Sequence, residues 1–163
     1  MARKAFYSFH YKPDNWRVST VRNLGVIEGN RSVSDNKWEE ITSGGDPAIK
    51  TWIADQMKGK SCTIVLIGSN TARRKWINYE ITKAWNDGRG VVGIYIHNLL
   101  DKNGKQSDKG ANPFAALTIS SQYMSSIVKA YNPPYTSSKF VYNHIADNIE
   151  AWVEEAITIR SKY

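Results

Sequence analysis

The most regular hydrophobic pattern lies in the middle of the chain, where two apolar runs flank a segment of helical periodicity. The runs cover residues 61–67 and 91–96. Unbroken apolar runs of this length are typical of strands that are covered on both faces of a parallel sheet. The segment between them repeats its apolar residues at helical spacing: Trp76, Ile77, Ile81, Ala84 and Trp85. A strand, a helix and another strand in this order predict a βαβ unit.

Weaker patterns predict elements on the N-terminal side. Residues 4–10 are short and rich in aromatics, which favours a first strand. A break at residues 13–15 precedes a predicted helix over residues 16–23, and residues 25–45 predict a long loop with a short strand. The Asp46-Pro47 dipeptide then predicts a helix start, with a cap residue followed by proline.

The C-terminal part of the chain predicts one clear helix. Apolar residues recur at helical spacing between residues 141 and 156. Residues 115–135 predict an irregular segment with one strand at residues 126–130. We therefore expect an α/β fold with a mainly parallel central sheet flanked by helices. At 163 residues the chain fits a single domain, residues 1–163.

Composition indicates where the protein is located and which partners it has, but it does not identify a reaction. The single cysteine, Cys62, lies in an apolar run and predicts a buried thiol without a disulfide. No signal peptide is recognised, and no apolar run approaches the ~20 residues that span a bilayer, so we expect a cytoplasmic protein without membrane contact. The net charge of +7 allows nucleic-acid binding, but the basic residues are scattered along the chain. We therefore expect no nucleic-acid partner.

Several familiar sites are excluded by their missing residues. Neither the dinucleotide fingerprint G-x-G-x-x-G nor a P-loop occurs. Residues 67–69, at the end of the predicted central strand, contain no acid that could accept a phosphate. Residues 101–105 hint at a calcium loop, but no glutamate closes it. The three histidines lack metal-ligand spacing, so we expect no metal.

Glu80 is the candidate chemical centre. It lies on or beside the apolar stripe of its predicted helix, where an ionised carboxylate is costly unless a partner meets it. An internal ion pair, with Lys83 or an arginine, is one interpretation. A functional carboxylate is the other. The predicted strands end near residues 8–10, 68–70 and 97–98, and in parallel sheets such ends share one edge, where ligands bind.

Three blocks of sequence, in order, resemble a known family. IGSNTARRKWINYE, residues 67–80, is similar to the third-strand and helix motif of TIR domains, whose helix carries W-x-x-x-E. KAFYSFHY near the start is similar to their first strand. Together with DKNGKQSDKGANPF, these blocks resemble the TIR-like proteins of bacterial Thoeris anti-phage systems. The resemblance covers about residues 2–114 and implies a three-layer flavodoxin-like fold.

The resemblance also implies an activity. Glu80 matches the catalytic glutamate of an NAD⁺ glycohydrolase or cyclase. The resemblance implies that the product is an ADP-ribose-type signal, which we expect to be cyclic, for a separate effector protein. It implies NAD⁺ as substrate without a further cofactor, and self-association on activation. One acid suffices because nicotinamide leaves as a neutral molecule, whereas ordinary glycosidases need two carboxyl groups. The residues expected to bind the substrate are Ser8, Phe9, His10, Trp38, Ser69, Asn70 and Trp76.

Two alternatives stay open on the sequence alone. One is a non-catalytic TIR-like module that acts by self-association, for which the polar stretch 25–45 would be a docking surface. The other is a nucleotide-binding or nucleic-acid-binding module attracted by the positive charge. The first predicts no nicotinamide release, and the second predicts salt-dependent binding.

Overall fold

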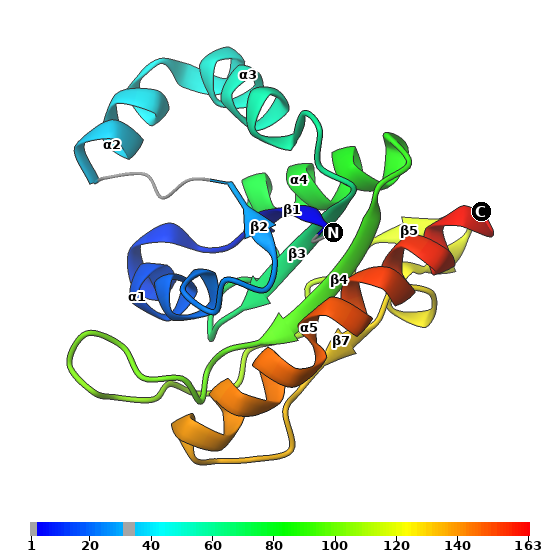
Figure 1. Cartoon of the computed structure of the whole chain (residues 1–163). Coiled ribbons are helices and arrows are strands. Elements are labelled where there is room, and N and C mark those ends of the chain that lie inside the picture. Colours follow the sequence, from blue (N-terminus) through cyan, green and yellow to red (C-terminus); the bar gives the residue numbers. More distant parts are fainter. Residues whose placement is uncertain (1–2, 31–34) are drawn as a thin grey trace.

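The computed structural model describes residues 3–30 and 35–163, and its centre is a five-stranded parallel sheet (Figure 1). The order of the strands is β2-β1-β3-β4-β7, which is the order of a flavodoxin-like fold. The strands of this sheet are β1 (Lys4–Ser8), β2 (Glu28–Gly29), β3 (Cys62–Ile67), β4 (Gly90–Tyr95) and β7 (Ala130–Tyr131). The expected α/β fold with a mainly parallel sheet is confirmed.

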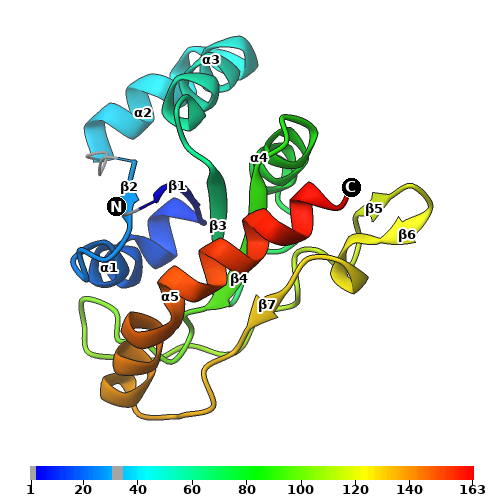
Figure 2. The ribbon, with the colours of Figure 1, turned by 45° about the vertical axis from the view of Figure 1, so that its right-hand side comes forward.

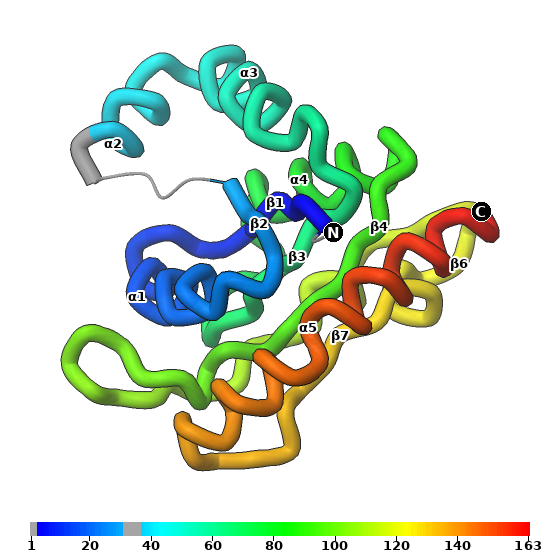
Figure 3. Tube along the Cα trace, in the orientation of Figure 1, coloured from blue at the N-terminus to red at the C-terminus, as the bar shows by residue number. Residues whose placement is uncertain are grey.

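Helices cover both faces of this sheet, so the fold has three layers (Figure 2). α1 and α5 pack on one face, while α3 and α4 pack on the other, with α2 lying against α3 (Figures 1 and 3). The helices are α1 (Tyr11–Arg22), α2 (Asp35–Ser43), α3 (Gly45–Met57), α4 (Lys75–Asn86) and α5 (Ser138–Ser161). A small hairpin of β5 (Thr118–Ile119) and β6 (Gln122–Tyr123) and a 3₁₀ turn, η1 (Met124–Ser126), precede β7.

The alternation of side chains along β3 explains its unbroken apolar sequence. Ile64 and Leu66 pack in the core beneath α1 and α5, whereas Val65 and Ile67 pack beneath α3 and α4. All six residues of β3 are buried. A strand that faces two cores cannot alternate between polar and apolar residues, so the predicted central strand is confirmed.

Two predicted boundaries on the N-terminal side are wrong. α1 begins at Tyr11 rather than at residue 16, with His10 as its N-cap. Pro13 therefore lies in the first turn, where proline is tolerated because the first amide groups of a helix have no intrahelical partner. Part of the predicted loop 25–45 is helical, since α2 buries Ile41 against the core. Residues 31–34 of that stretch lie outside the described residues.

In the C-terminal part, the structure agrees more closely with the elements predicted from the sequence. α5 confirms the predicted last helix, and its apolar stripe packs on β3 and β4. The strand expected at residues 126–130 is wrong, because η1 and a turn occupy most of that range and β7 begins at Ala130. No helix in the described ranges is both long and apolar enough to cross a membrane. The domain limits, residues 1–163, stay a prediction.

A buried arginine fixes the loop after β4 to α1. Arg17 is 4% exposed, and its guanidinium donates to the carbonyl oxygens of Leu99 at 2.8 Å and Lys105 at 2.9 Å. It also lies 3.4 Å from the carboxylate of Asp14, which is itself 2% exposed. Burial, opposed by Arg17, raises the pKa of Asp14 to about 6. This arrangement holds residues 99–105 beside the start of α1.

Candidate active site

Glu80 lies in the middle of α4, on the side of the helix that faces β1. Its side chain is buried, with 7% of the residue exposed. Ser8, the last residue of β1, donates a hydrogen bond from its Oγ to Oε1 of Glu80 at 2.6 Å. The contact joins residues 72 positions apart, because β1 and β3 are neighbours and α4 follows β3. The sheet order therefore brings this hydroxyl and this carboxylate together.

Burial dominates the electrostatics of Glu80. Removal of the carboxyl group from water raises its pKa to about 8, against a smaller lowering by the hydrogen bond from Ser8. Among the residues that the structure describes, Glu80 makes no ion pair with a lysine or arginine, and Lys83 instead pairs with Asp87 at 2.9 Å. The internal ion pair considered from the sequence is therefore not what holds Glu80. A carboxyl group that borders a cavity and whose pKa is strongly raised by burial is a candidate functional group.

The carboxyl group borders a small cavity with aromatic walls. The cavity has a volume of about 30 Å³, which is room for about two water molecules. Its lining residues are Phe6, Tyr7, Phe9, Tyr11, Arg22, Asn30, Trp38, Trp52 and Glu80. We call this space the inner cavity. In this conformation it is too small for a nicotinamide nucleoside.

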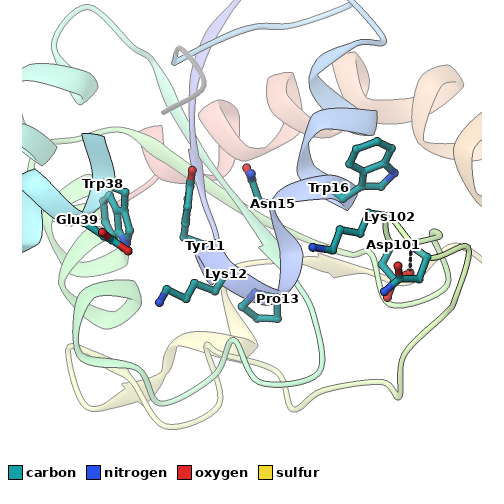
Figure 4. A pocket seen from close by; sticks show the side chains of 10 residues that line it. Tyr11, Lys12, Pro13, Asn15, Trp16, Trp38, Glu39, Asp101 and Lys102 are labelled. Carbon is teal, nitrogen blue, oxygen red and sulfur yellow. Dashed lines mark hydrogen bonds between the residues drawn. The ribbon is translucent and has the colours of Figure 1, made fainter. Parts of the chain in front are cut away.

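A larger hollow lies on the other side of two of these aromatic walls. It has a volume of about 580 Å³ and is bounded by the start of α1, by α2 and by the loop at residues 101–103 (Figure 4). Tyr11 and Trp38 line both spaces, and their rings stack with centroids 5.4 Å apart. We call this space the outer hollow. One stacked pair thus forms a wall shared by the inner cavity and the outer hollow.

Two polar residues of the inner cavity were not predicted from the sequence. Asn30 is 5% exposed and accepts a hydrogen bond from the backbone amide of Tyr7 at 2.7 Å, which ties the end of β2 to β1. The guanidinium of Arg22 lies over the rings of Tyr7, at 5.8 Å, and Phe9, at 5.4 Å. Neither residue belongs to a recognisable motif. Only the packing of α1 and β2 against β1 places them here.

The structure brings together some of the predicted site residues and separates the others. Ser8, Phe9 and Trp38 surround the carboxyl group of Glu80 or its cavity.

Four predicted residues do not line the inner cavity. His10 caps α1, and Trp76 packs edge-on against Tyr79 with ring centroids 5.4 Å apart. Ser69 and Asn70 border a separate shallow hollow that also contains Arg73 and Arg74. Substrate contacts by all seven of the predicted binding residues stay predictions.

Comparison with known proteins identifies the family. Residues 6–101, more than half of the chain, match the family described as "Thoeris protein ThsB, TIR-like domain". The chain belongs to this family. The matched region includes β1, β3 and α4, and therefore both Ser8 and Glu80. The resemblance seen in the three sequence blocks, and the TIR-type fold that it implies, are confirmed.

A curated ThsB relative adds detail. The chain is 40% identical over 119 residues to the "Putative cyclic ADP-D-ribose synthase ThsB1" of Bacillus cereus (strain MSX-D12). The aligned part covers 70% of this chain and 62% of that protein. The chain thus spans less than two thirds of the length of this relative.

Proposed function

We propose that this ThsB-family chain cleaves the bond between nicotinamide and ribose in NAD⁺ and forms an ADP-ribose-type nucleotide. We expect this nucleotide to be cyclic. The observation that carries the proposal is the buried carboxyl group of Glu80, held by Ser8 at the wall of an aromatic cavity. The name of the relative from Bacillus cereus supports the substrate class. NAD⁺ is a substrate here, and the proposal needs no metal and no further cofactor.

The geometry suits stabilisation of a developing positive charge. When the bond from the anomeric carbon to the nicotinamide nitrogen breaks, its electron pair leaves with nicotinamide, which becomes neutral. The ribose becomes cation-like, and the Glu80 carboxylate stabilises that charge strongly because the site is dry. Water, or a nucleophilic group of the same ADP-ribose, then attacks the anomeric carbon and releases a proton.

The raised pKa of Glu80 fits a site that is completed by its substrate. In the free protein the carboxyl group holds its proton up to a pH of about 8. The nicotinamide ring of NAD⁺ carries a positive charge, and a cation within a few ångströms lowers the pKa of a carboxyl group. Binding of the substrate therefore generates the carboxylate that the reaction needs.

The inner cavity has to enlarge before this chemistry can occur. Its present volume, about 30 Å³, excludes the nicotinamide and ribose rings. We propose that self-association moves Trp38 away from Tyr11, because Trp38 lies on α2, which packs mainly against α3 rather than on the sheet. The nucleotide product would then act on a separate effector protein.

A pH profile tests the proposed role of Glu80. Because kcat/KM reports ionisations of the free enzyme, it should fall about tenfold for each pH unit below an apparent pKa near 8. The profile of kcat reports the bound state and should have its midpoint at a lower pH. Nicotinamide release, measured by chromatography between pH 5.5 and 9.5, provides both curves. Profiles of kcat/KM that stay flat from pH 6 to 9 would contradict the proposal.

Removal of the Ser8 hydroxyl should shift that profile. In Ser8→Ala the carboxylate loses a hydrogen bond that favours its charged form, so the pKa of Glu80 rises further. We expect the kcat/KM curve to move to higher pH, with a smaller change at its plateau. Ser126→Ala, whose hydroxyl donates to the carbonyl oxygen of Tyr123 and does not line the inner cavity, serves as the matched control. An unshifted curve for Ser8→Ala would exclude the hydrogen bond as a determinant of the pKa.

The small size of the inner cavity also favours a second candidate function. A TIR-like module that acts only by self-association needs no access to Glu80, and a cavity of about 30 Å³ is consistent with that role. This candidate predicts no nicotinamide release at any protein concentration or in infected cells. It also predicts that Glu80→Gln leaves the biological function intact.

A further inference from the structure

The chemistry proposed at Glu80 gives no role to the outer hollow. Its volume of about 580 Å³ lies within the ~300–1,000 Å³ range of small-molecule sites. We propose that the outer hollow is the subsite for the adenosine diphosphate part of the substrate. This inference rests on the proposed function for its biological meaning, although ADP binding can be measured without turnover.

Two lysines from different elements supply positive charge to this hollow. Lys12 lies in the first turn of α1, and Lys102 lies in the loop after β4 (Figure 4). Ammonium groups from two walls suit a pyrophosphate, which carries negative charge on both of its phosphates. Because Lys102 is exposed and belongs to a loop, its side chain can adjust to the ligand.

The outer hollow also contains two acidic residues, Asp101 and Glu39, so a pyrophosphate has to bind where the two ammonium groups lie and away from the carboxylates. Asp101 accepts hydrogen bonds from the backbone amides of Asn103, at 2.8 Å, and Lys105, at 3.0 Å, and lies 4.0 Å from Arg17. Its carboxylate is therefore engaged in shaping the loop. Glu39 is exposed on α2, one residue after Trp38, where its carboxylate can accept hydrogen bonds from ribose hydroxyls.

Trp16 provides a flat surface at the end of the outer hollow away from Trp38 (Figure 4). It is 58% exposed, although a tryptophan normally gains by burying its ring. Trp16 lies four residues after Lys12 on α1, so the two side chains share a face of the helix, and Asn15 lies beside them. A ring for stacking and an amide for hydrogen bonding suit adenine.

The shared wall sets the direction of the bound dinucleotide. Tyr11 and Trp38 separate the outer hollow from the inner cavity, so a ligand that passes this pair reaches Glu80. The adenine end then lies at Trp16, the pyrophosphate lies between Lys12 and Lys102, and the nicotinamide end points inward. ADP alone should therefore bind the free protein even while the inner cavity is too small for the nicotinamide and ribose rings.

The test is a titration of purified protein with ADP, followed by calorimetry, with adenosine as the uncharged comparison. Trp16→Leu should weaken ADP binding about tenfold, because base stacking on an aromatic ring is lost. Lys102→Gln should weaken ADP binding several-fold and leave adenosine binding unchanged. Lys58→Gln, an exposed lysine outside both spaces, is the matched control and should bind ADP as the wild type does.

The outcomes separate this inference from the proposed function. No ADP binding by the wild type, or equal ADP affinity in Trp16→Leu, Lys102→Gln and the wild type, would overturn the subsite. ADP binding with these losses, but without nicotinamide release either at high protein concentration or in phage-infected cells, supports the subsite and removes the proposed function. Turnover of NAD⁺ with KM unchanged in Trp16→Leu and Lys102→Gln supports the function and removes the subsite.

Discussion

Glu80→Gln is expected to reduce NAD⁺ consumption at least about a hundredfold, the cost that follows loss of one preorganised electrostatic group in an active site. Glutamine keeps the shape of the side chain and can still accept the hydrogen bond from Ser8. It carries no charge, so it cannot stabilise a ribose cation. Chromatography of NAD⁺ and of adenine-containing products, at high protein concentration and in phage-infected cells, measures the effect. Equal NAD⁺ consumption by both proteins would remove Glu80 from its role.

The same substitution should stabilise the fold at neutral and alkaline pH. The unfolded chain releases the Glu80 proton near its ordinary pKa of 4.5, whereas the folded protein holds it until about 8. Between these values the folded state binds more protons, so the free energy of unfolding falls as the pH rises. We expect Glu80→Gln to match the wild type near pH 4 and to exceed it by a few kcal/mol at pH 8.

Urea unfolding at several pH values measures this gain. Glu150→Gln, at an exposed position of α5, is the matched control and should change stability by less than about 0.5 kcal/mol at each pH. A protein that loses activity and gains stability has lost a functional group rather than its fold. If Glu80→Gln were destabilised at pH 8, the buried carboxyl group would be a structural residue.

Arg17→Met should cause a large loss of stability, about 3–5 kcal/mol, because it breaks a buried ion pair by removing one partner. Methionine fills much of the space of the Arg17 side chain but donates no hydrogen bond. The carbonyl oxygen of Leu99 then loses its guanidinium donor, that of Lys105 keeps only the backbone amide of Asp101, and Asp14 loses its ion-pair partner. Denaturant unfolding measures the loss, and limited proteolysis should cut the loop at residues 99–105 sooner.

A second arginine offers a matched control for this prediction. Arg3 pairs with Glu154 at 2.7 Å, but both side chains are about half exposed. Exposed pairs contribute about 0–1 kcal/mol, so Arg3→Met should have little effect. Similar losses for the two variants would mean that burial of Arg17 is not what makes its contacts important.

The site shows which of its features can be predicted from the local sequence and which cannot. The helical stripe around Glu80 placed its carboxylate at the border of the core, and the structure has it 7% exposed. The W-x-x-x-E spacing within the three-block resemblance singled out the same residue. The sequence could not identify the partner of Glu80, because Ser8 is 72 residues away and meets it only through the pairing of β1 with β3.

The sequence by itself determined those elements whose environment repeats along the chain. β3 and β4 are buried on both faces and leave unbroken apolar runs, whereas α4 and α5 are buried on one face and leave a helical repeat, so both patterns can be read locally. Only the tertiary structure decided the rest. The strand order, the aromatic wall of Tyr11 and Trp38, and the contact of Arg17 with Leu99 join distant segments. Such contacts leave no periodic signal, because their free energy depends on which elements become neighbours when the chain folds.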